Sequence, residues 1–240
     1  MIIVIILLSL LFTTLGFLLS VKNAKYLLSG YNTMSKEDQE KVDIKNYIAF
    51  FRKFHLLLGL SLFFAGVAIY LLVGTLAAGI FIAIYPLLAY IFFVLASSKY
   101  FGNAGQKKHK SGVFILLGAL LLVTLIFIFG NRGNKLEYDK DRIEIKGMYG
   151  ETIQRSDIES IRLIDKLPGV RLKTNGYSIG AIHKGYFKTV DGEVVKLLVD
   201  NNKGPFLCII KINGKKIYYS SKGKSNQKLL EEINTVFILE

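Results

Sequence analysis

Residues 56–98 read LLLGLSLFFAGVAIYLLVGTLAAGIFIAIYPLLAYIFFVLASS and contain no Asp, Glu, Lys, Arg or His. A single helix of these 43 residues would be roughly 65 Å long at about 1.5 Å per residue, whereas the hydrocarbon core of a membrane is about 30 Å thick. The stretch is therefore expected to cross a membrane twice. Gly74, Thr75 and Gly79 mark the expected hairpin.

Two further stretches, residues 1–21 and 111–131, also lack ionisable side chains. Each is long enough for one apolar helix. The sequence therefore predicts a transmembrane domain over residues 1–131, connected after the first span by an amphipathic loop at 22–55. The four expected helical spans lie near residues 2–20, 56–73, 77–96 and 112–129.

Basic residues indicate how these spans are oriented. The loop from Lys22 to His55 carries seven Lys and Arg, the 99–110 segment is basic again, and the 74–79 turn has no charge. By the positive-inside rule both basic loops face the cytoplasm. Four spans then place the N-terminus and the C-terminal domain outside, an inference that depends on the first span crossing. We expect a multi-pass protein of the bacterial cytoplasmic membrane.

The first basic loop has structure of its own. Ser35 followed by Asp38 predicts a capped short helix. Beyond it, Ile44, Tyr47, Ile48, Phe51 and His55 recur at helical spacing. The aromatic residues either lie at headgroup depth while basic residues meet phosphates, or they pack against the other spans. The pattern favours neither alternative.

The composition changes after Asn131, where the last 110 residues carry 20 Lys and Arg against 14 Asp and Glu. A soluble domain is expected over residues 132–240, with Cys208 at a buried strand position inside an apolar run. Period-two alternation predicts strands at residues 142–146, 158–164, 194–199, 206–212 and 216–219.

Turn and helix signals complete this domain. Asn213-Gly214 predicts a hairpin with a type I′ turn, and Asp191-Gly192 offers a second such turn. The last stretch changes to helical periodicity, with Ser225 as the expected N-cap. Its apolar face consists of Leu229, Leu230, Ile233, Val236 and Phe237.

Two parts of the chain resemble known families. The loop G-Y-N-T-M-S at residues 30–35 is similar to that of a bacterial membrane family of unknown function. Ile158-Glu-Ser-Ile161, Arg171, Asn175-Gly176, Gly180 and Gly185-Tyr-Phe187 resemble bacterial pleckstrin-homology-like (PH-like) domains. This second resemblance implies a mostly-β fold, a bent seven-stranded antiparallel sheet or barrel capped by a C-terminal α-helix. Neither resemblance implies an activity.

Candidate functional residues are those that could contact a membrane surface or a partner. They are Tyr31, Asn32, Arg52, Lys53, Lys107, Lys108, Lys110, Lys146 and Arg155. A specific phosphoinositide is not expected, because Lys146 and Arg155 are far apart and Glu151 lies between them. No spacing of His, Cys, Ser, Asp or Glu indicates an enzyme, a metal site or another cofactor, and nucleic acid is not an expected partner.

The charge-free spans weigh against ion-coupled transport, which needs ionisable groups inside the membrane. The expected function is a non-enzymatic membrane protein whose soluble domain binds a protein or peptide, with the bilayer and another membrane or envelope protein as partners. A small transporter or channel subunit with a regulatory tail is one alternative. An anionic-lipid-binding module is another.

Overall fold

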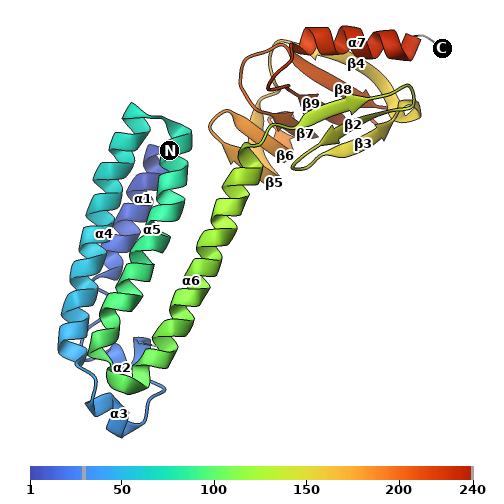
Figure 1. Cartoon of the computed structure of the whole chain (residues 1–240). Helices are drawn as coiled ribbons and strands as arrows, with labels where there is room; N and C mark the ends of the chain where they lie inside the picture. Colours follow the sequence, from blue (N-terminus) through green and yellow to red (C-terminus); the bar gives the residue numbers. More distant parts are fainter. Residues whose placement is uncertain (29–30, 239–240) are drawn as a thin grey trace. The chain divides into compact units, whose positions relative to one another are not determined.

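The structure is a computed structural model that describes residues 1–28 and 31–238; the side chains of residues 102–110 and 238 lie outside the described part. The chain divides into two compact units, Met1–Leu125 and Ile126–Glu240. Helices before the β strands are α1 (Ile2–Leu15), α2 (Ala24–Leu27), α3 (Lys36–Glu40), α4 (Ile44–Leu72), α5 (Thr75–Ser97) and α6 (Gly102–Asn131), with a 3₁₀ turn at Ser98–Tyr100 (Figure 1).

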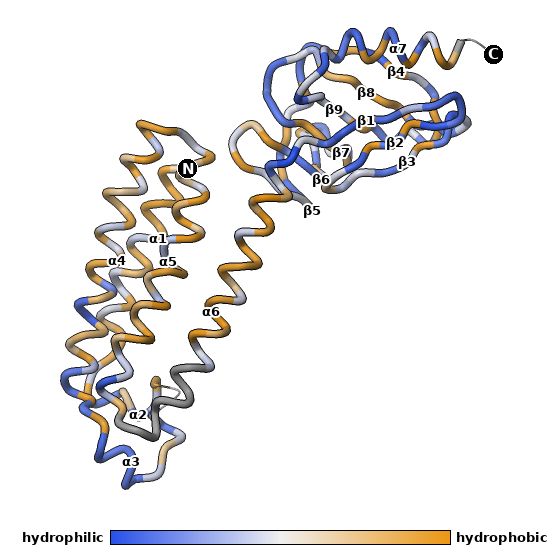
Figure 2. The backbone as a smooth tube through the Cα atoms, in the orientation of Figure 1, coloured by the Kyte–Doolittle hydropathy of each residue, from blue (hydrophilic) through white to orange (hydrophobic). Residues whose placement is uncertain are grey.

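Among the described residues, three helices are long and apolar enough to cross a membrane: Ile44–Leu72, Thr75–Tyr100 and Ser111–Asn131. The prediction of four spans is wrong in this respect. The first helix has 14 residues, about 21 Å at 1.5 Å per residue, and the chain then turns tightly, with Leu18 N–H bonded to the Leu15 carbonyl. Apolar residues nevertheless predominate along α1, α5, the later turns of α4 and the part of α6 that Figure 2 colours.

The helix α4 begins twelve residues earlier than the span predicted at 56–73. Asp43 caps it, because its side chain accepts from the Asn46 N–H. The predicted amphipathic segment is therefore the first part of the membrane helix and not a separate loop. The capped helix predicted at Ser35 is confirmed, since Ser35 Oγ accepts from the Asp38 N–H at 3.1 Å in front of α3.

Two glycines bring α1 and α4 close together. A Cβ added at Gly59 would lie 2.7 Å from the Ser9 carbonyl oxygen, and one added at Gly66 would lie 3.2 Å from the Ile5 side chain. Ile5 lies opposite Gly66 and Ser9 opposite Gly59, so the two helices run antiparallel. Small residues allow such close helix approach in apolar surroundings.

The unit after Ile126 contains nine described strands in two sheets. They are β1 (Lys135–Tyr138), β2 (Arg142–Lys146), β3 (Glu151–Gln154), β4 (Ile158–Ile164), β5 (Val170–Ile179), β6 (Ile182–Thr189), β7 (Val194–Val199), β8 (Phe206–Lys211) and β9 (Lys216–Tyr219). The first three strands form one sheet, and the second sheet has the order β4-β8-β9-β7-β6-β5. Its β7 and β9 are parallel. A single seven-stranded antiparallel sheet is therefore not what forms, although a mostly-β domain is confirmed.

Alternate residues of β7 enter two cores. Leu198 packs with residues of β1–β3 and with the final helix α7 (Asn226–Ile238), whereas Leu197 packs with Phe187 and Phe206 on the other face. Leu229 and Ile233 of α7 are buried in the first core, as the helical periodicity predicts. Cys208 is a buried free thiol in β8, which confirms its predicted position.

The two predicted hairpins form, but with a different turn. Lys211 N–H bonds to the Lys215 carbonyl and Gly214 N–H bonds back to Lys211. Gly214 has φ 79°, whereas Asn213 is not among the positive-φ residues. A type I′ turn is therefore wrong. A three-residue loop with glycine in the left-handed position closes the hairpin, and residues 190–192 repeat this arrangement.

Candidate functional site

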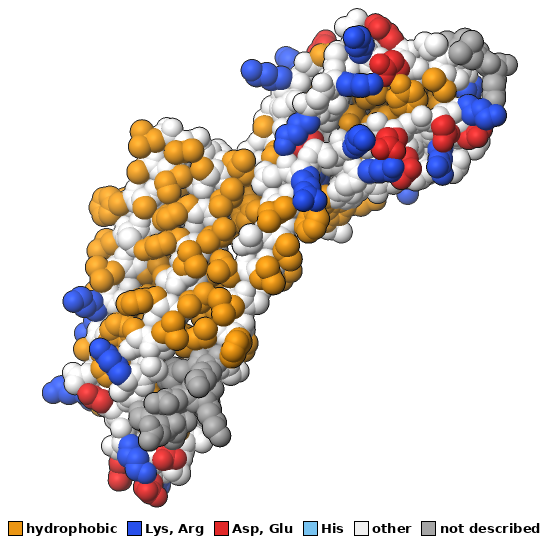
Figure 3. Space-filling model, viewed as in Figure 1, with side chains coloured by type: hydrophobic (Ala, Val, Ile, Leu, Met, Phe, Trp, Pro, Cys, Tyr) orange, Lys and Arg blue, Asp and Glu red, His pale blue; other side chains and the backbone are white. Residues whose placement is uncertain are grey.

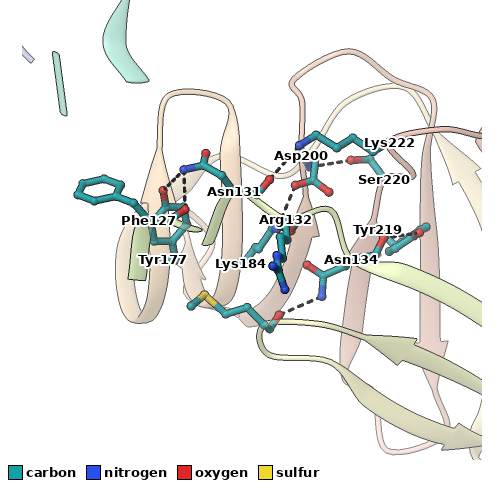
Figure 4. Close-up of polar contacts among 11 residues, drawn as sticks. Phe127, Asn131, Arg132, Asn134, Tyr177, Lys184, Asp200, Tyr219, Ser220 and Lys222 are labelled. Atoms are coloured by element: carbon teal, nitrogen blue, oxygen red, sulfur yellow. Dashed lines mark hydrogen bonds and ion pairs between the residues drawn. The ribbon is translucent and has the colours of Figure 1, made fainter. Parts of the chain in front are cut away.

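The end of α6 is bonded directly to the β domain (Figure 4). Asn131 Nδ2 donates to the Phe127 carbonyl at 2.8 Å and to the Tyr177 hydroxyl at 3.1 Å. Lys222 Nζ donates to the Asn131 carbonyl at 2.9 Å. A lysine at this position satisfies a carbonyl that the helix itself leaves free, and it places a positive charge at the negative end of the helix.

A buried ion pair holds the next residue. Lys184 and Asp200 have side chains that are 0% and 1% exposed, and Lys184 Nζ lies 3.0 Å from Asp200 Oδ1. Lys184 Nζ also donates to the Arg132 carbonyl. Burial lowers the pKa of Lys184, and the carboxylate of Asp200 opposes that shift. The Asp200 N–H donates to Ser220 Oγ at 2.8 Å, which connects the ends of β7 and β9.

Asn134 completes this set of contacts, which we call the polar anchor: Asn131, Tyr177, Lys184, Asp200, Lys222 and Asn134 with the backbone of residues 131–134. Asn134 Nδ2 donates to the Met148 carbonyl at 3.0 Å, and the Asn134 carbonyl accepts from the Tyr219 hydroxyl at 2.9 Å. The anchor therefore holds the chain between α6 and β1 from several strands at once. Its charged groups are engaged with one another and with backbone, which suits positioning and not reaction chemistry.

A second buried constellation lies in the helical unit. His55 is 1% exposed, with Nδ1 2.8 Å from the Phe51 carbonyl and Nε2 2.9 Å from the Tyr90 hydroxyl. Because a carbonyl only accepts, Nδ1 carries the proton and Nε2 accepts from Tyr90. Phe54 and Phe93 pack around the imidazole ring. Both ring nitrogens are used, so the arrangement favours a structural role.

His55 corrects the expectation that no ionisable residue lies within the membrane helices. The charge-free stretch begins at residue 56, but α4 already contains His55 as its twelfth residue. Tyr47 and Ile48 are buried as well. Of the two alternatives for this segment, packing against other helices is therefore the one that the buried residues support.

The structure does not bring the predicted candidate residues together. Tyr31 is half-buried against the apolar cluster of the helical unit, and Asn32 and Lys53 are exposed. The Arg52 guanidinium lies 5.5 Å from the Phe17 ring. The side chains of Lys107, Lys108 and Lys110 lie outside the described residues, as does Gly30 of the quoted loop.

In the β domain the two candidates are already engaged. Lys146 pairs with Glu137, and the Arg155 guanidinium lies 4.8 Å from the Phe237 ring. The polar anchor was not foreseen. One signal for it is present in the sequence. Lys184 lies two residues after the apolar Ile182 and therefore shares the inward face of β6 with it. No group of His, Cys, Asp and Glu among the described residues could hold a metal ion.

The apolar helices and the mostly-β domain define a protein with a helical region suited to a membrane and a folded C-terminal domain. Residues 6–101 match the model of a family described as a domain of unknown function (DUF3784). The match includes the His55 cluster and stops before α6, so it does not include the polar anchor. Comparison with curated proteins and with solved structures found no match.

Proposed function

We propose that this chain is a non-enzymatic membrane protein whose β domain, a PH-like scaffold, binds a protein or peptide partner at the membrane. The observation that carries the proposal is the buried Lys184–Asp200 pair on the Arg132 carbonyl. A domain that needed only a tether could follow α6 through an exposed linker. Desolvating two charges is costly, and here the buried pair holds the segment that joins the end of α6 to β1.

The β domain also offers a free sheet edge. Among the described residues, the strand β5 pairs with β6 alone, and residues 170–175 are exposed. An edge strand has backbone donors and acceptors that a peptide can use by adding a strand. Charged side chains of both signs are scattered over the face of this domain that Figure 3 shows. These features support binding in preference to transport.

We propose that the β domain faces away from the cytoplasm. The basic residues before and within the start of α4, and those between the end of α5 and the first turns of α6, favour cytoplasmic positions for both segments. The uncharged α4–α5 turn would then be outside. Three crossings, by α4, α5 and α6, then take the chain from the cytoplasmic basic segment to the outer side of the membrane. This count starts after α1, so the side of the domain no longer depends on whether α1 crosses.

The proposal is tested by crosslinking in native membranes followed by mass spectrometry. A photo-reactive residue is placed in turn at Lys166 and Lys188 on the β domain and at Leu72 in the helical unit; all three positions are exposed. We expect reproducible protein crosslinks from the β domain and few from Leu72. Crosslinks confined to Leu72 would instead favour a membrane subunit function. Adducts only to lipid at all positions would favour a lipid-binding module.

A further inference from the structure

The β domain gathers its exposed apolar residues at one end. The large apolar residues that are exposed in the described part of this domain are Val170, Leu172, Tyr186, Val190, Val194 and Ile212. Strand register places Leu172 beside Lys188 and Lys188 beside Val194. The Val190 N–H bonds to the Gly169 carbonyl, which brings the 190–192 loop to the start of β5.

The parallel pairing of β7 and β9 explains this arrangement. Parallel strands start at the same end of a sheet, so Val194 and Lys216 lie near one another, each following a three-residue hairpin loop. Lys216 Nζ pairs with Glu193 at 2.9 Å and connects the two hairpins. We call this end, with its six exposed apolar residues, the tip surface.

A small cationic pocket lies within the tip surface. Its volume is about 260 Å³, and its lining includes Tyr186 and Val194 together with four lysines and one glutamate, Glu151. Pockets for drug-sized ligands typically measure about 300–1,000 Å³. The size therefore suits a single side chain of a partner.

The charges in this pocket do not balance. The two carboxylate oxygens of Glu151 are occupied by Lys196 at 3.1 Å and Lys211 at 2.9 Å. Lys196 has a side chain that is 7% exposed, so its charge is poorly solvated. Glu193 offsets Lys216. One glutamate therefore serves two ammonium groups, and Lys215 adds a further positive charge at the pocket mouth.

We propose that the tip surface binds a partner protein through an acidic side chain, seated in the lysine pocket and flanked by apolar residues. A carboxylate would complete the charge balance that Glu151 leaves open, because charge-assisted hydrogen bonds to lysine are strongest where water is restricted. Tyr186, Val194 and Ile212 would contact the flanking apolar residues. This inference rests on the proposed function and names the chemistry of its partner.

The pocket lies at the opposite end of β7 and β9 from the polar anchor. Asp200 of the polar anchor follows the end of β7, and Tyr219, which donates to the Asn134 carbonyl of the anchor, ends β9. The six residues of β7 place the tip surface roughly 20 Å from that end at about 3.3 Å per residue. The pocket thus lies well away from the point where the chain leaves α6.

The test uses the full chain in nanodiscs of zwitterionic lipid and a fluorescent peptide that alternates Glu and Leu. We expect Lys215→Glu to weaken binding at least about tenfold, because it places a like charge at the pocket. Lys203→Glu is the matched control: it makes the same charge change at an exposed lysine after the other end of β7. The affinity of that variant should be within about twofold of the wild type, since the distance from Lys203 to the pocket exceeds the screening length of the solution.

Equal loss in both variants would show unspecific charge attraction and overturn the inference. A second outcome would also overturn it: the peptide does not bind, whereas vesicles of anionic lipid bind and Lys215→Glu weakens that binding. To identify the partner itself, a photo-reactive residue is also placed at Ile212. Lys188 lies within the tip surface, so protein crosslinks from Lys166 with none from Lys188 or Ile212 would reject the tip surface and leave the proposed function standing. The absence of protein crosslinks from every position would reject both.

Discussion

At the scale of single residues, the Lys184–Asp200 pair is the most costly feature of the β domain, because both charges are removed from water. Asp200→Asn leaves the ammonium group buried without a counter-charge. We expect it to reduce the free energy of unfolding of this domain by about 3–5 kcal/mol. Cys208 provides the readout: it is the single cysteine of the chain and is 1% exposed, so its labelling rate in denaturant reports unfolding.

Glu232→Gln is the matched control for that change. It breaks the pair with Lys224, whose side chains are 60% and 37% exposed, and exposed pairs contribute at most about 1 kcal/mol. Lys184→Met combined with Asp200→Leu should recover much of the loss, since no unpaired charge remains. Equal effects of Asp200→Asn and Glu232→Gln would mean that the buried pair does not hold the domain.

Glu151 makes stability depend on pH. Burial acts to raise the pKa of Glu151, but hydrogen bonds from Lys211 and Lys196 outweigh it, so the pKa lies below its usual 4.5. A carboxyl whose pKa is lower in the folded than in the unfolded state contributes its full stabilisation at a pH above the unfolded-state pKa. That stabilisation is lost as the pH falls through the folded-state pKa. The stability difference between wild type and Glu151→Gln should therefore shrink on acidification below about pH 4.5.

Melting curves from pH 7 to pH 3 would measure this difference. Glu159→Gln serves as the comparison, because Glu159 is an exposed carboxylate of β4 that forms no ion pair within the described residues. We expect no comparable pH-dependent change for that variant. A difference between Glu151→Gln and wild type that is constant with pH would contradict the lysine pairing.

At the scale of elements, the sequence predicts five of the strands from their apolar residues. Buried and exposed residues alternate in β2, whereas β7 and β8 are apolar runs that are buried almost throughout. It misses β1, β3, β5 and β6, the last two for identifiable reasons. In β5, apolar and basic residues alternate at 170–173, but residues 170–175 are all exposed, so this alternation does not mark a buried face. Within β6 the buried residues include Lys184 and Gly185, which carry no apolar signal. The polar anchor was missed for the same cause, since its inward residues are charged or polar.

The helix α7 was predicted from its apolar face, and the structure distinguishes its members. Ile233 is 0% exposed, whereas Leu230 is only partly buried. Ile233→Asp should therefore lower the free energy of unfolding by several kcal/mol, about what an unpaired buried charge costs. Asn234→Asp introduces the same side chain at the exposed neighbouring position. Cys208 labelling that is indistinguishable between the two variants would show that α7 is not docked.

The close packing of α1 on α4 depends on the absence of a side chain at Gly59. Gly59→Leu would place side-chain atoms against Ser9 and Thr13 of α1, and overpacking typically costs about 1–3 kcal/mol. We expect the helical melting midpoint in detergent, followed by circular dichroism, to fall by several degrees. Gly118→Leu adds the same side chain to α6, where a Cβ meets nothing within 4 Å. This control should melt like the wild type.

At the scale of the whole molecule, the membrane-suited region and the folded C-terminal domain were predictable because their compositions differ so strongly. The number of crossings was not. Residues 1–21 are apolar enough to span, yet α1 ends at Leu15. Apolar composition alone does not say whether a helix continues or turns. The order of strands in the sheet was also out of reach, since the parallel pairing of β7 with β9 joins segments that a hairpin signal does not connect.

The side of the membrane that the β domain faces is the prediction with the widest consequence, because it decides which partners can reach the tip surface. Lys166→Cys places an exposed thiol on the β domain, and Lys36→Cys places one on α3. Native Cys208 is buried and contributes little background. An impermeant maleimide should label Lys166→Cys in right-side-out membrane vesicles and Lys36→Cys in inverted ones, as the positive-inside rule requires. The opposite labelling of both variants would place the β domain in the cytoplasm. Labelling of both from one side would mean that α4, α5 and α6 do not make an odd number of crossings.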